Sequence, residues 1–213
     1  MKWPTADQLA TLMPLPPGYR MRSFDRNAIG PLVTALKRWH PHISAGVSGG
    51  YLREEFYETK VCLHGETETD IFVVPIHFGD ELVGMWSIER EEDSLALYGR
   101  LIVIAPEHRG SGLAVGVLVG SEHVGRAMGA EFMYVLTTLK HLYAQQALER
   151  AGYRLLGFFP GFDREEVEPG IVKRVYQAVY AKLLVSTDCI HLPEIRNMTP
   201  RTRQIFELLF ADC

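Results

Sequence analysis

The stretch APEHRGSGLAVG, residues 105–116, combines residue types that can bind an anion. It lies between the apolar run RLIVIA and a second apolar run with the periodicity of a helix. The first N–H groups of a helix lack internal partners and lie at the positive end of its dipole. Gly110 and Gly112 let a ligand approach the main chain, and Arg109 adds a charged fork suited to phosphate oxygens. The stretch therefore predicts a phosphate site, best suited to a pyrophosphate.

Three alternatives apply to the same turn. Glycines that serve close packing alone would give a similar sequence, and the sequence leaves that alternative open. A P-loop needs Lys and Ser or Thr after its second glycine, whereas Leu113 and Ala114 follow here. The glycines of GSGLAVG imitate a dinucleotide fingerprint, but Glu131 begins the next strand instead of ending it, which argues against that site.

The elements that must position this turn form an α+β mixture. Three strand-like runs are joined by the short links GD and REED, so neighbouring strands must be antiparallel. A helix, a strand, a second helix and two strands separated by an acidic loop follow. In chain order the expected elements are strands 70–78, 81–89 and 94–105, helix 112–129, strand 131–138, helix 142–152, and strands 153–162 and 174–185. Helix 112–129 then makes one parallel crossover.

The two ends of the chain carry helical signals. We expect a helix over 5–13, a strand over 19–24, a loop over 41–50 and a second helix over 51–59. A helix over 25–40 would begin at Asp25 as N-cap, with Gly30 and Pro31 favouring an early end. In TPRTRQIFELLF, Thr199 and Pro200 predict a C-terminal helix that packs back or serves dimerisation. The expected organisation is a domain over 1–185, with a lead-in over 1–18, and a helical extension over 186–213.

Composition narrows the class of protein. The 213 residues are 47% hydrophobic and 23% charged, which is typical of a globular chain, and the net charge of −4 gives no support for nucleic-acid binding. The scattered Cys62, Cys189 and Cys213 indicate a reducing compartment rather than a disulfide framework. We see no signal peptide and no apolar run of the roughly 18–20 residues that span a bilayer, so we expect a cytoplasmic protein without a membrane partner. No metal site is expected, because the histidines of WHPHI lack further ligands.

The turn and its context resemble the GCN5-related N-acetyltransferase (GNAT) superfamily. RGSGLA, residues 109–114, matches that family's R/Q-x-x-G-x-G/A motif, IVIAPEHRG resembles the end of its fourth strand, and ALERAGYRLLGFF resembles its later helix, glycine-aromatic turn and strand. The resemblance covers residues 69–185. It implies a GNAT-type fold, in which a mostly antiparallel twisted sheet of about seven strands splays between parallel strands four and five, with flanking helices.

The resemblance also implies acetyl-CoA, or another acyl-CoA, as cofactor and an N-acyltransferase activity. An amine of a small molecule or a protein would attack the thioester directly, while nearby amides polarise its carbonyl. The pantetheine would run beside Ile102, Val103 and Ile104. The residues expected to hold the pyrophosphate are Arg109, Gly110, Ser111, Gly112, Leu113 and Ala114.

The residues for proton transfer depart from the family's pattern. Many members use a glutamate on the fourth strand, but SLALYGRLIVIA has no acid, and Tyr98 and Arg100 stand about where one would look. Glu89, at the end of the preceding strand, is the best placed acid, although it could simply belong to a solvated turn. The family's usual tyrosine acid corresponds to Leu148.

Two residues near the start of that later helix are the remaining candidates. Tyr143 could replace the missing tyrosine or serve packing alone. His141 could act as a base near neutral pH or be an ordinary capping histidine, and it shares a face with Gln145 if the helix begins by residue 141. The departures at the strand-four acid and at Leu148 leave a second hypothesis, a CoA-binding module without catalysis.

Overall fold

The computed structural model describes residues 1–66 and 68–210, which form an eight-stranded sheet with helices on both faces. Seven strands follow the order β1-β3-β4-β5-β6-β8-β7, and β2 pairs with β3 beside this path. The strands are β1 (Tyr19–Met21), β2 (Val61–Cys62), β3 (Ile71–Phe78), β4 (Glu81–Glu91), β5 (Ala96–Ile104), β6 (Phe132–Thr138), β7 (Arg154–Glu168) and β8 (Ile171–Leu183).

Pairing in the sheet is antiparallel except between β5 and β6 and between β2 and β3. The expected mostly antiparallel sheet with a parallel crossover is therefore confirmed. The short β2 strand was not foreseen. The β3–β4 and β4–β5 hairpins confirm the links expected at GD and REED.

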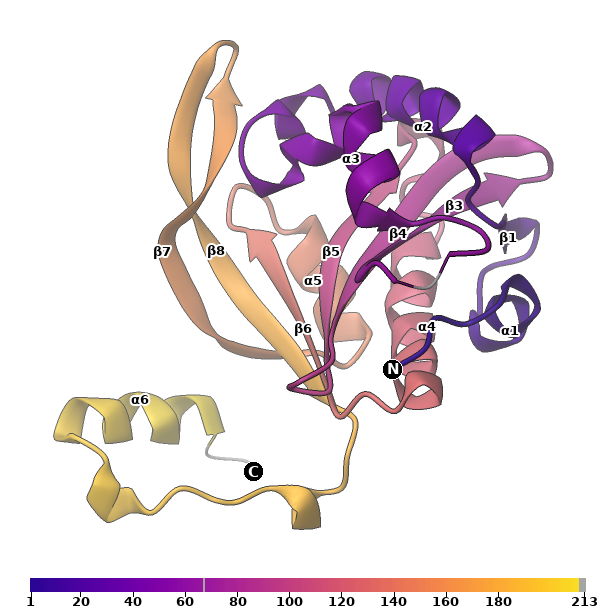
Figure 1. The fold of residues 1–213 in the computed structure, drawn as a ribbon. Helices are drawn as coiled ribbons and strands as arrows, with labels where there is room; N and C mark the ends of the chain where they lie inside the picture. The colour runs from indigo at the N-terminus through magenta and orange to yellow at the C-terminus, as the bar shows by residue number, and fades with distance from the viewer. Residues whose placement is uncertain (67, 211–213) are drawn as a thin grey trace.

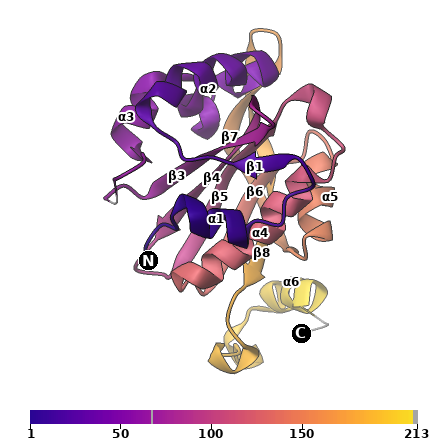
Figure 2. The same cartoon turned by 90° about the vertical axis from the view of Figure 1, so that its right-hand side faces the viewer.

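The helices form a layer on each face of the sheet. α2 (Arg26–Trp39) and α3 (Glu54–Lys60) cover one face, while α1 (Ala6–Leu12), α4 (Leu113–Met128) and α5 (Tyr143–Arg150) cover the other (Figures 1 and 2). α4 makes the crossover from β5 to β6. The turn that precedes α4 consequently lies at the end of β5.

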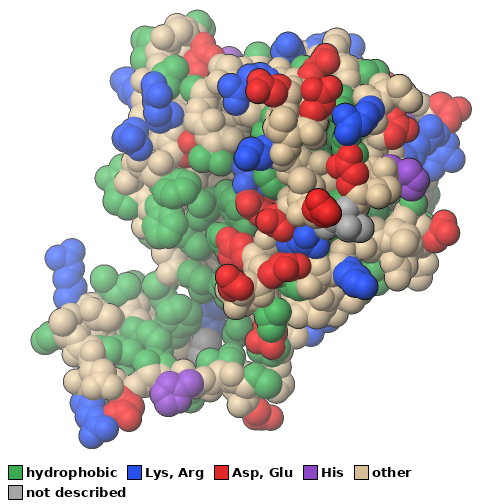
Figure 3. Space-filling model, viewed as in Figure 1, with side chains coloured by type: hydrophobic (Ala, Val, Ile, Leu, Met, Phe, Trp, Pro, Cys, Tyr) green, Lys and Arg blue, Asp and Glu red, His purple; other side chains and the backbone are tan. Residues whose placement is uncertain are grey.

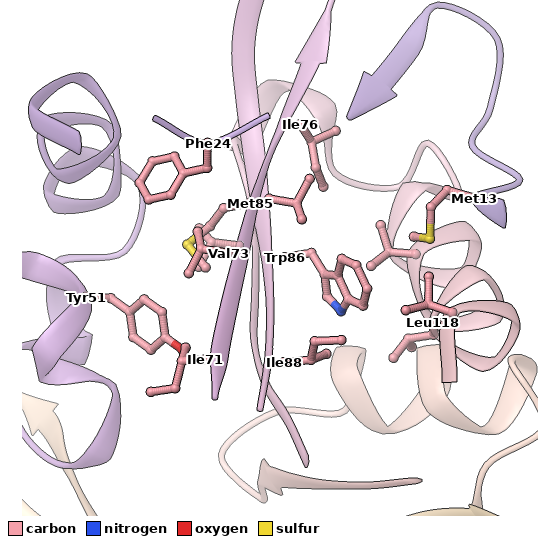
Figure 4. Close-up of a cluster of buried hydrophobic side chains, with 14 of the residues drawn as sticks. Met13, Phe24, Tyr51, Ile71, Val73, Ile76, Met85, Trp86, Ile88 and Leu118 are labelled. Carbon is pink, nitrogen blue, oxygen red and sulfur yellow. The ribbon is translucent and has the colours of Figure 1, made fainter. Parts of the chain in front are cut away.

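Two apolar cores separate these layers because neighbouring residues of a strand face opposite ways. Met85 of β4 points to Phe24 and Tyr51 on the α2–α3 side, whereas Trp86 points to Met13 and Leu118 on the α4 side (Figure 4). Each large buried apolar side chain contributes about 1.5–3 kcal/mol relative to exposure. The cores fix β4 and β5, whose ends carry the candidate site.

α2 begins as expected but does not end early. The Asp25 side chain accepts hydrogen bonds from the N–H groups of Asn27 and Ala28, at 2.9 and 3.2 Å, and so confirms the expected N-cap. The early end expected at Gly30 and Pro31 is wrong, because the helix continues to Trp39. Its apolar face packs on the sheet and outweighs the one backbone bond that proline removes; the buried residues of that face are Ile29, Leu32, Val33, Leu36 and Trp39.

The expected loop over 41–50 is compact. It forms the short 3₁₀ helices η1 (Pro41–Ser44) and η2 (Val47–Leu52). α3 therefore begins at Glu54, later than the residue 51 we expected. η1 and η2 lie next to β7, so this segment and the β7–β8 hairpin face each other (Figure 1).

The acidic loop expected between the last two strands is wrong. β7 runs to Glu168 and β8 starts at Ile171, with Asp163 opposite Val175 and Glu168 opposite Ile171. Gly170 makes the tight turn with φ +75°. In the hairpin, the backbone N–H and C=O groups of this charged segment are paired with those of the neighbouring strand. The strand therefore forms although its composition favours a loop.

After β8 the chain leaves the sheet. α6 (Pro200–Phe210) begins as expected, with the Thr199 hydroxyl accepting from the N–H of Thr202 at 3.2 Å. The helix lies apart from the helical layers (Figure 1) and touches β7 through Arg154, which donates to the carbonyl of Leu209 at 2.7 Å. Cys62 and Cys189 are free thiols, and Cys213 lies outside the described residues. None of the helices built from the described residues is long and apolar enough to cross a bilayer.

Candidate active site

The turn between β5 and α4 needs glycine at two positions. Gly110 and Gly112 have φ of +77° and +83°, a backbone conformation that other residues rarely adopt. A Cβ placed on either glycine would meet no atom within 4 Å. The glycines therefore do not serve close packing; they shape the turn and leave its outer side open.

Main-chain N–H groups of this turn are available to a ligand. The Ser111 hydroxyl donates to the carbonyl of His108 at 2.8 Å and accepts from the N–H of Leu113 at 3.4 Å. Throughout residues 1–66 and 68–210, no protein acceptor takes the N–H of Gly110, Ser111, Gly112 or Ala114. α4 also has no side-chain cap, so the positive end of its dipole faces the opening. This arrangement can bind a phosphate or pyrophosphate.

Arg109 anchors the turn. Its guanidinium donates to the carbonyls of Ile104 and Trp39, at 3.2 and 3.3 Å, and so ties the turn to the ends of β5 and α2. A guanidinium has five N–H groups, so further donors stay available for an anion. The expected phosphate contact of Arg109 stays a prediction, and the side chain has a positioning role in addition.

Further cationic groups gather beside the turn. Burial lowers the pKa of His40 below its ordinary value, and nearby positive charges lower it further. Those charges belong to Arg109, His42, His141 and Lys140. The end of α2 and the segment between β6 and α5 thus converge on the turn. The concentration of positive charge suits an anionic ligand.

The strands beside the turn diverge. Pairing between β5 and β6 covers Ala96–Gly99 and Phe132–Val135 only, although both strands continue beyond it. On the other side of β5, Gly99 pairs with Ile88 and Leu101 with Ser87, so Arg100 forms a bulge. The backbone of Ile102–Ile104 is left open toward β6, where an extended ligand could lie.

The bulge directs Arg100 into a polar cluster under η2. Its guanidinium pairs with the carboxylate of Glu89 and donates to the Tyr51 hydroxyl at 3.0 Å. The Tyr51 hydroxyl lies 2.6 Å from that of Ser87. Glu89 is thus held by a cation through one carboxylate oxygen, Oε2, and its other oxygen stays able to accept a proton. Its role as base stays a prediction, for which the structure supplies a competing, positioning role.

Tyr98 lies on β5 two residues before the bulge, opposite Glu89. Its ring stacks on that of Tyr134 with centroids 4.9 Å apart, and the Tyr134 hydroxyl donates to Glu91 at 2.6 Å. Burial raises the pKa of Tyr98 to about 12, so its hydroxyl keeps its proton at neutral pH. Across the part of the chain that the structure describes, no protein group hydrogen-bonds to this hydroxyl.

His141 and Tyr143 lie at the surface. The side chain of Tyr143 is 75% exposed, and its ring centroid is 5.6 Å from that of His141. α5 begins at Tyr143, too late for His141 and Gln145 to share a helical face; Gln145 instead donates to the carbonyl of His141 at 2.9 Å. Leu148 is 1% exposed and belongs to the core. The structure therefore does not bring His141 and Tyr143 into contact with Glu89.

Comparisons with known proteins bear on this geometry. A model of the acetyltransferase (GNAT) family matches residues 35–153. The chain belongs to the GNAT family. A search of curated proteins finds no match.

Solved structures share the GNAT fold at low sequence identity. The microcin C7 self-immunity acetyltransferase MccE, solved with acetyl-CoA and AMP, is 11% identical, with a TM-score of 0.61 over 79% of this chain and 93% of that one. The ribosomal L7/L12 α-N-protein acetyltransferase RimL, solved with coenzyme A, is 14% identical, with a TM-score of 0.61 over 80% and 97%. The spermidine/spermine N-acetyltransferase SpeG from Vibrio cholerae is 14% identical, with a TM-score of 0.63 over 78% and 94%.

Membership of the GNAT family identifies the reaction and the cofactor of the chain. Members of the family use acetyl-CoA to acetylate an amine, and this chain is an acetyl-CoA-dependent N-acetyltransferase. The free amides of the turn fit a pyrophosphate, and the open edge of β5 fits an extended pantetheine. No three His, Cys, Asp or Glu side chains among the described residues converge on a point that could hold a metal ion.

Proposed function

We propose that the turn over 109–114 and the open edge of Ile102–Ile104 bind acetyl-CoA for transfer to a primary amine of a small molecule or a protein. The observation that carries the proposal is the set of free N–H groups at the mouth of the β5–β6 splay. Acetyl-CoA supplies the activated thioester. The chain supplies amides that hold the diphosphate and a cleft between strands that orients the extended part.

Two measurements test this assignment. Isothermal titration calorimetry with acetyl-CoA should give binding in the micromolar range, about −8 kcal/mol. Release of free thiol should then follow the addition of a primary amine from a panel of monoamines, diamines, polyamines and short peptides. Absence of heat on titration would contradict the cofactor site. Binding without thiol release for every amine would favour the CoA-binding module without catalysis.

The proton donor to the departing thiolate is the Tyr98 hydroxyl in this proposal. The residue lies two residues before the bulge, its hydroxyl keeps its proton at neutral pH, and its ring is held against Tyr134. Sequence reasoning sought a tyrosine on the later helix, where Leu148 fills the core instead. The sequence places Tyr98 on the fourth strand of the GNAT pattern. The bulge at Arg100, which changes the direction of the strand beside Tyr98, is visible only in the structure.

Self-association through the C-terminal extension is a further part of the proposal. Apolar side chains gather between this extension and the lower part of the β7–β8 hairpin (Figure 3). The exposed apolar residues of these elements include Phe158, Phe159, Tyr176, Leu183 and Leu208. Sedimentation of the full chain and of a form truncated at residue 190 would test it, since only the full chain should dimerise. The free thiols keep the cytoplasm as the location we propose.

A further inference from the structure

Two polar side chains are buried on the hairpin that faces η1 and η2. Asp163 of β7 is 9% exposed and Gln177 of β8 is 7% exposed. Among the described residues, Asp163 is the one charged residue that is buried. A buried carboxylate is costly unless it is paired. The hydrogen-bond and ion-pair partners of Asp163 therefore show how far its charge is compensated.

One oxygen of Asp163 closes the facing loop. Oδ1 accepts from the N–H of Val47 at 3.0 Å and from that of Arg164 at 2.7 Å. Gly46 has φ +83°, and a Cβ there would lie 2.3 Å from this oxygen, so the loop reaches Asp163 only with glycine at that position. In the described part of the chain, the other oxygen has no hydrogen-bond partner and no cation pairs with the carboxylate.

Gln177 presents a second oxygen without a partner. Its Oε1 is buried and accepts no hydrogen bond from any described residue. Asp163 pairs with Val175, and Val175 and Gln177 are two residues apart on β8, so both polar side chains lie on the same face of the hairpin. Diagonal neighbours of this kind are about 7–8 Å apart at the backbone. Both oxygens therefore belong to side chains of the same face of the hairpin.

That region borders the transfer site. β6 pairs with β8, and the pairing places Gln177 on the face that also carries Tyr134 and its stacking partner Tyr98. The charge of Asp163 is among the influences that raise the pKa of Tyr98. Asp163 and Gln177 thus lie on the hairpin strands across the splay from the bulge, and β7 packs against η1.

Three charged side chains near this region have partners of opposite charge. Arg100 is paired with Glu89, Lys140 lies 3.3 Å from Glu165, and His42 lies 3.9 Å from Glu166. Among the described residues no cation forms an ion pair with Asp163. The space between its free oxygen and Oε1 of Gln177 is called the recess below. A cationic ligand with several hydrogens to donate would complement both oxygens.

We infer that Asp163 and Gln177 bind the ammonium group of the amine acceptor and restrict the acceptor to cationic primary amines. The inference rests on the proposed function and names the recognition residues of its second substrate. An ammonium donates to the free oxygen of Asp163 and to Oε1 of Gln177 together. A neutral isostere such as an alcohol leaves the carboxylate without a counter-charge, so the recess rejects it.

The variant Asp163→Asn tests the charge while keeping the loop. An asparagine oxygen can still accept from Val47 and Arg164, so the hairpin contact survives. We expect roughly tenfold or more increase in the KM of the best amine of the panel, with the KM of acetyl-CoA within about twofold. Glu168→Gln removes the same charge from the exposed tip of β7 and should leave both KM values unchanged. An unchanged amine KM in Asp163→Asn overturns the inference.

Gln177→Leu separates recognition from structure. Removal of a buried oxygen without a partner should leave the melting temperature unchanged or higher, because no hydrogen bond of the fold is lost. The KM of the amine should nevertheless rise by roughly threefold. A lower melting temperature with an unchanged amine KM would show that Gln177 serves the fold alone, and would overturn its part in recognition.

A crystal of the protein with CoA and propane-1,3-diamine decides the binding site without turnover. We expect an amine nitrogen within hydrogen-bond distance of both Asp163 and Gln177, and none in the same crystal of Asp163→Asn. Water alone in the wild-type recess overturns the inference even if amines are acetylated. If no amine of the panel is acetylated, the proposed function fails, and the diamine density still decides whether this recess binds ammonium.

Discussion

The donor side and the acceptor side of the splay are built in different ways. The donor side that we propose consists of backbone groups from one stretch, residues 102–114, in which the N–H groups of Gly110, Ser111, Gly112 and Ala114 have no acceptor among the described residues. The acceptor side that we propose consists of side chains from separate strands, Asp163 of β7 and Gln177 of β8, near Arg100 of β5, and the main-chain N–H of Val47 holds Asp163. The two sides meet where β5 and β6 diverge.

The two proposed sides therefore depend on different features of the chain. A diphosphate is recognised by main-chain geometry, and the spacing of glycines in the sequence indicates that geometry. An amine is recognised by buried charge, which depends on which strands pair and in which register. We therefore expect changes on the donor side to affect binding of acetyl-CoA regardless of the acceptor.

The largest effect should come from Gly112→Val. Valine at φ +83° is strained, and its side chain would fill the open side of the turn. The affinity for acetyl-CoA should fall about 100-fold, equal to about 2.7 kcal/mol, by titration calorimetry. Gly129→Val is the matched control, because Gly129 caps the other end of α4 with φ +77° and equally open surroundings. Equal loss of affinity in both variants would show that strain, not the ligand site, is responsible.

Arg109→Met should have the next largest effect. It removes the hydrogen bonds to the carbonyls of Ile104 and Trp39, so the turn is no longer tied to β5 and α2. We expect roughly tenfold weaker acetyl-CoA binding, about 1.4 kcal/mol, and an unchanged preference among amines. Arg126→Met, at the far end of α4, should leave acetyl-CoA binding unaltered. A changed amine preference in Arg109→Met would mean that the two sides are not independent.

The sequence predicted the position of the turn because its signals are local. Gly110, Gly112 and the strand-to-helix change are neighbours in the chain, and the structure places them as expected at the end of β5. The burial of Asp163 was not predicted, because the charged residues around it suggested a loop, and only the pairing of β7 with β8 turns its side chain inward. Glu89 was found by position, but its pairing with Arg100 depends on a bulge that no local pattern indicates.

Glu89→Gln distinguishes a base from a positioning residue. If Glu89 mainly holds Arg100, the variant should lose about 1 kcal/mol of unfolding free energy, and the acid limb of its kcat/KM profile should keep its midpoint. Tyr143→Phe at the exposed start of α5 should change stability by less than about 0.5 kcal/mol. Urea denaturation and a pH–rate profile supply both readouts. Disappearance of the acid limb in Glu89→Gln would establish the base role instead.

The smallest effect should appear in the pH dependence of stability. Burial, and then nearby positive charges, lower the pKa of His40 below its ordinary value of 6.5. As the pH falls through 6.5, His40 becomes protonated in the unfolded chain but stays neutral in the folded chain. The unfolding free energy therefore decreases. His40→Gln should weaken this acid destabilisation. His77→Gln should do so too, because burial and the charges of Arg22 and Arg20 lower the pKa of His77.

Acetyl-CoA separates the two histidines. The charges facing His40 include Arg109 of the turn, whereas His77 lies on β3 among charges of the β1–β3 end. A bound diphosphate brings negative charge near His40, favours its protonated form and should remove most of its share of the acid destabilisation. The share of His77 should persist. Thermal melts between pH 5 and pH 7, with and without acetyl-CoA, give the comparison, and equal ligand effects on both shares would place the diphosphate away from the turn.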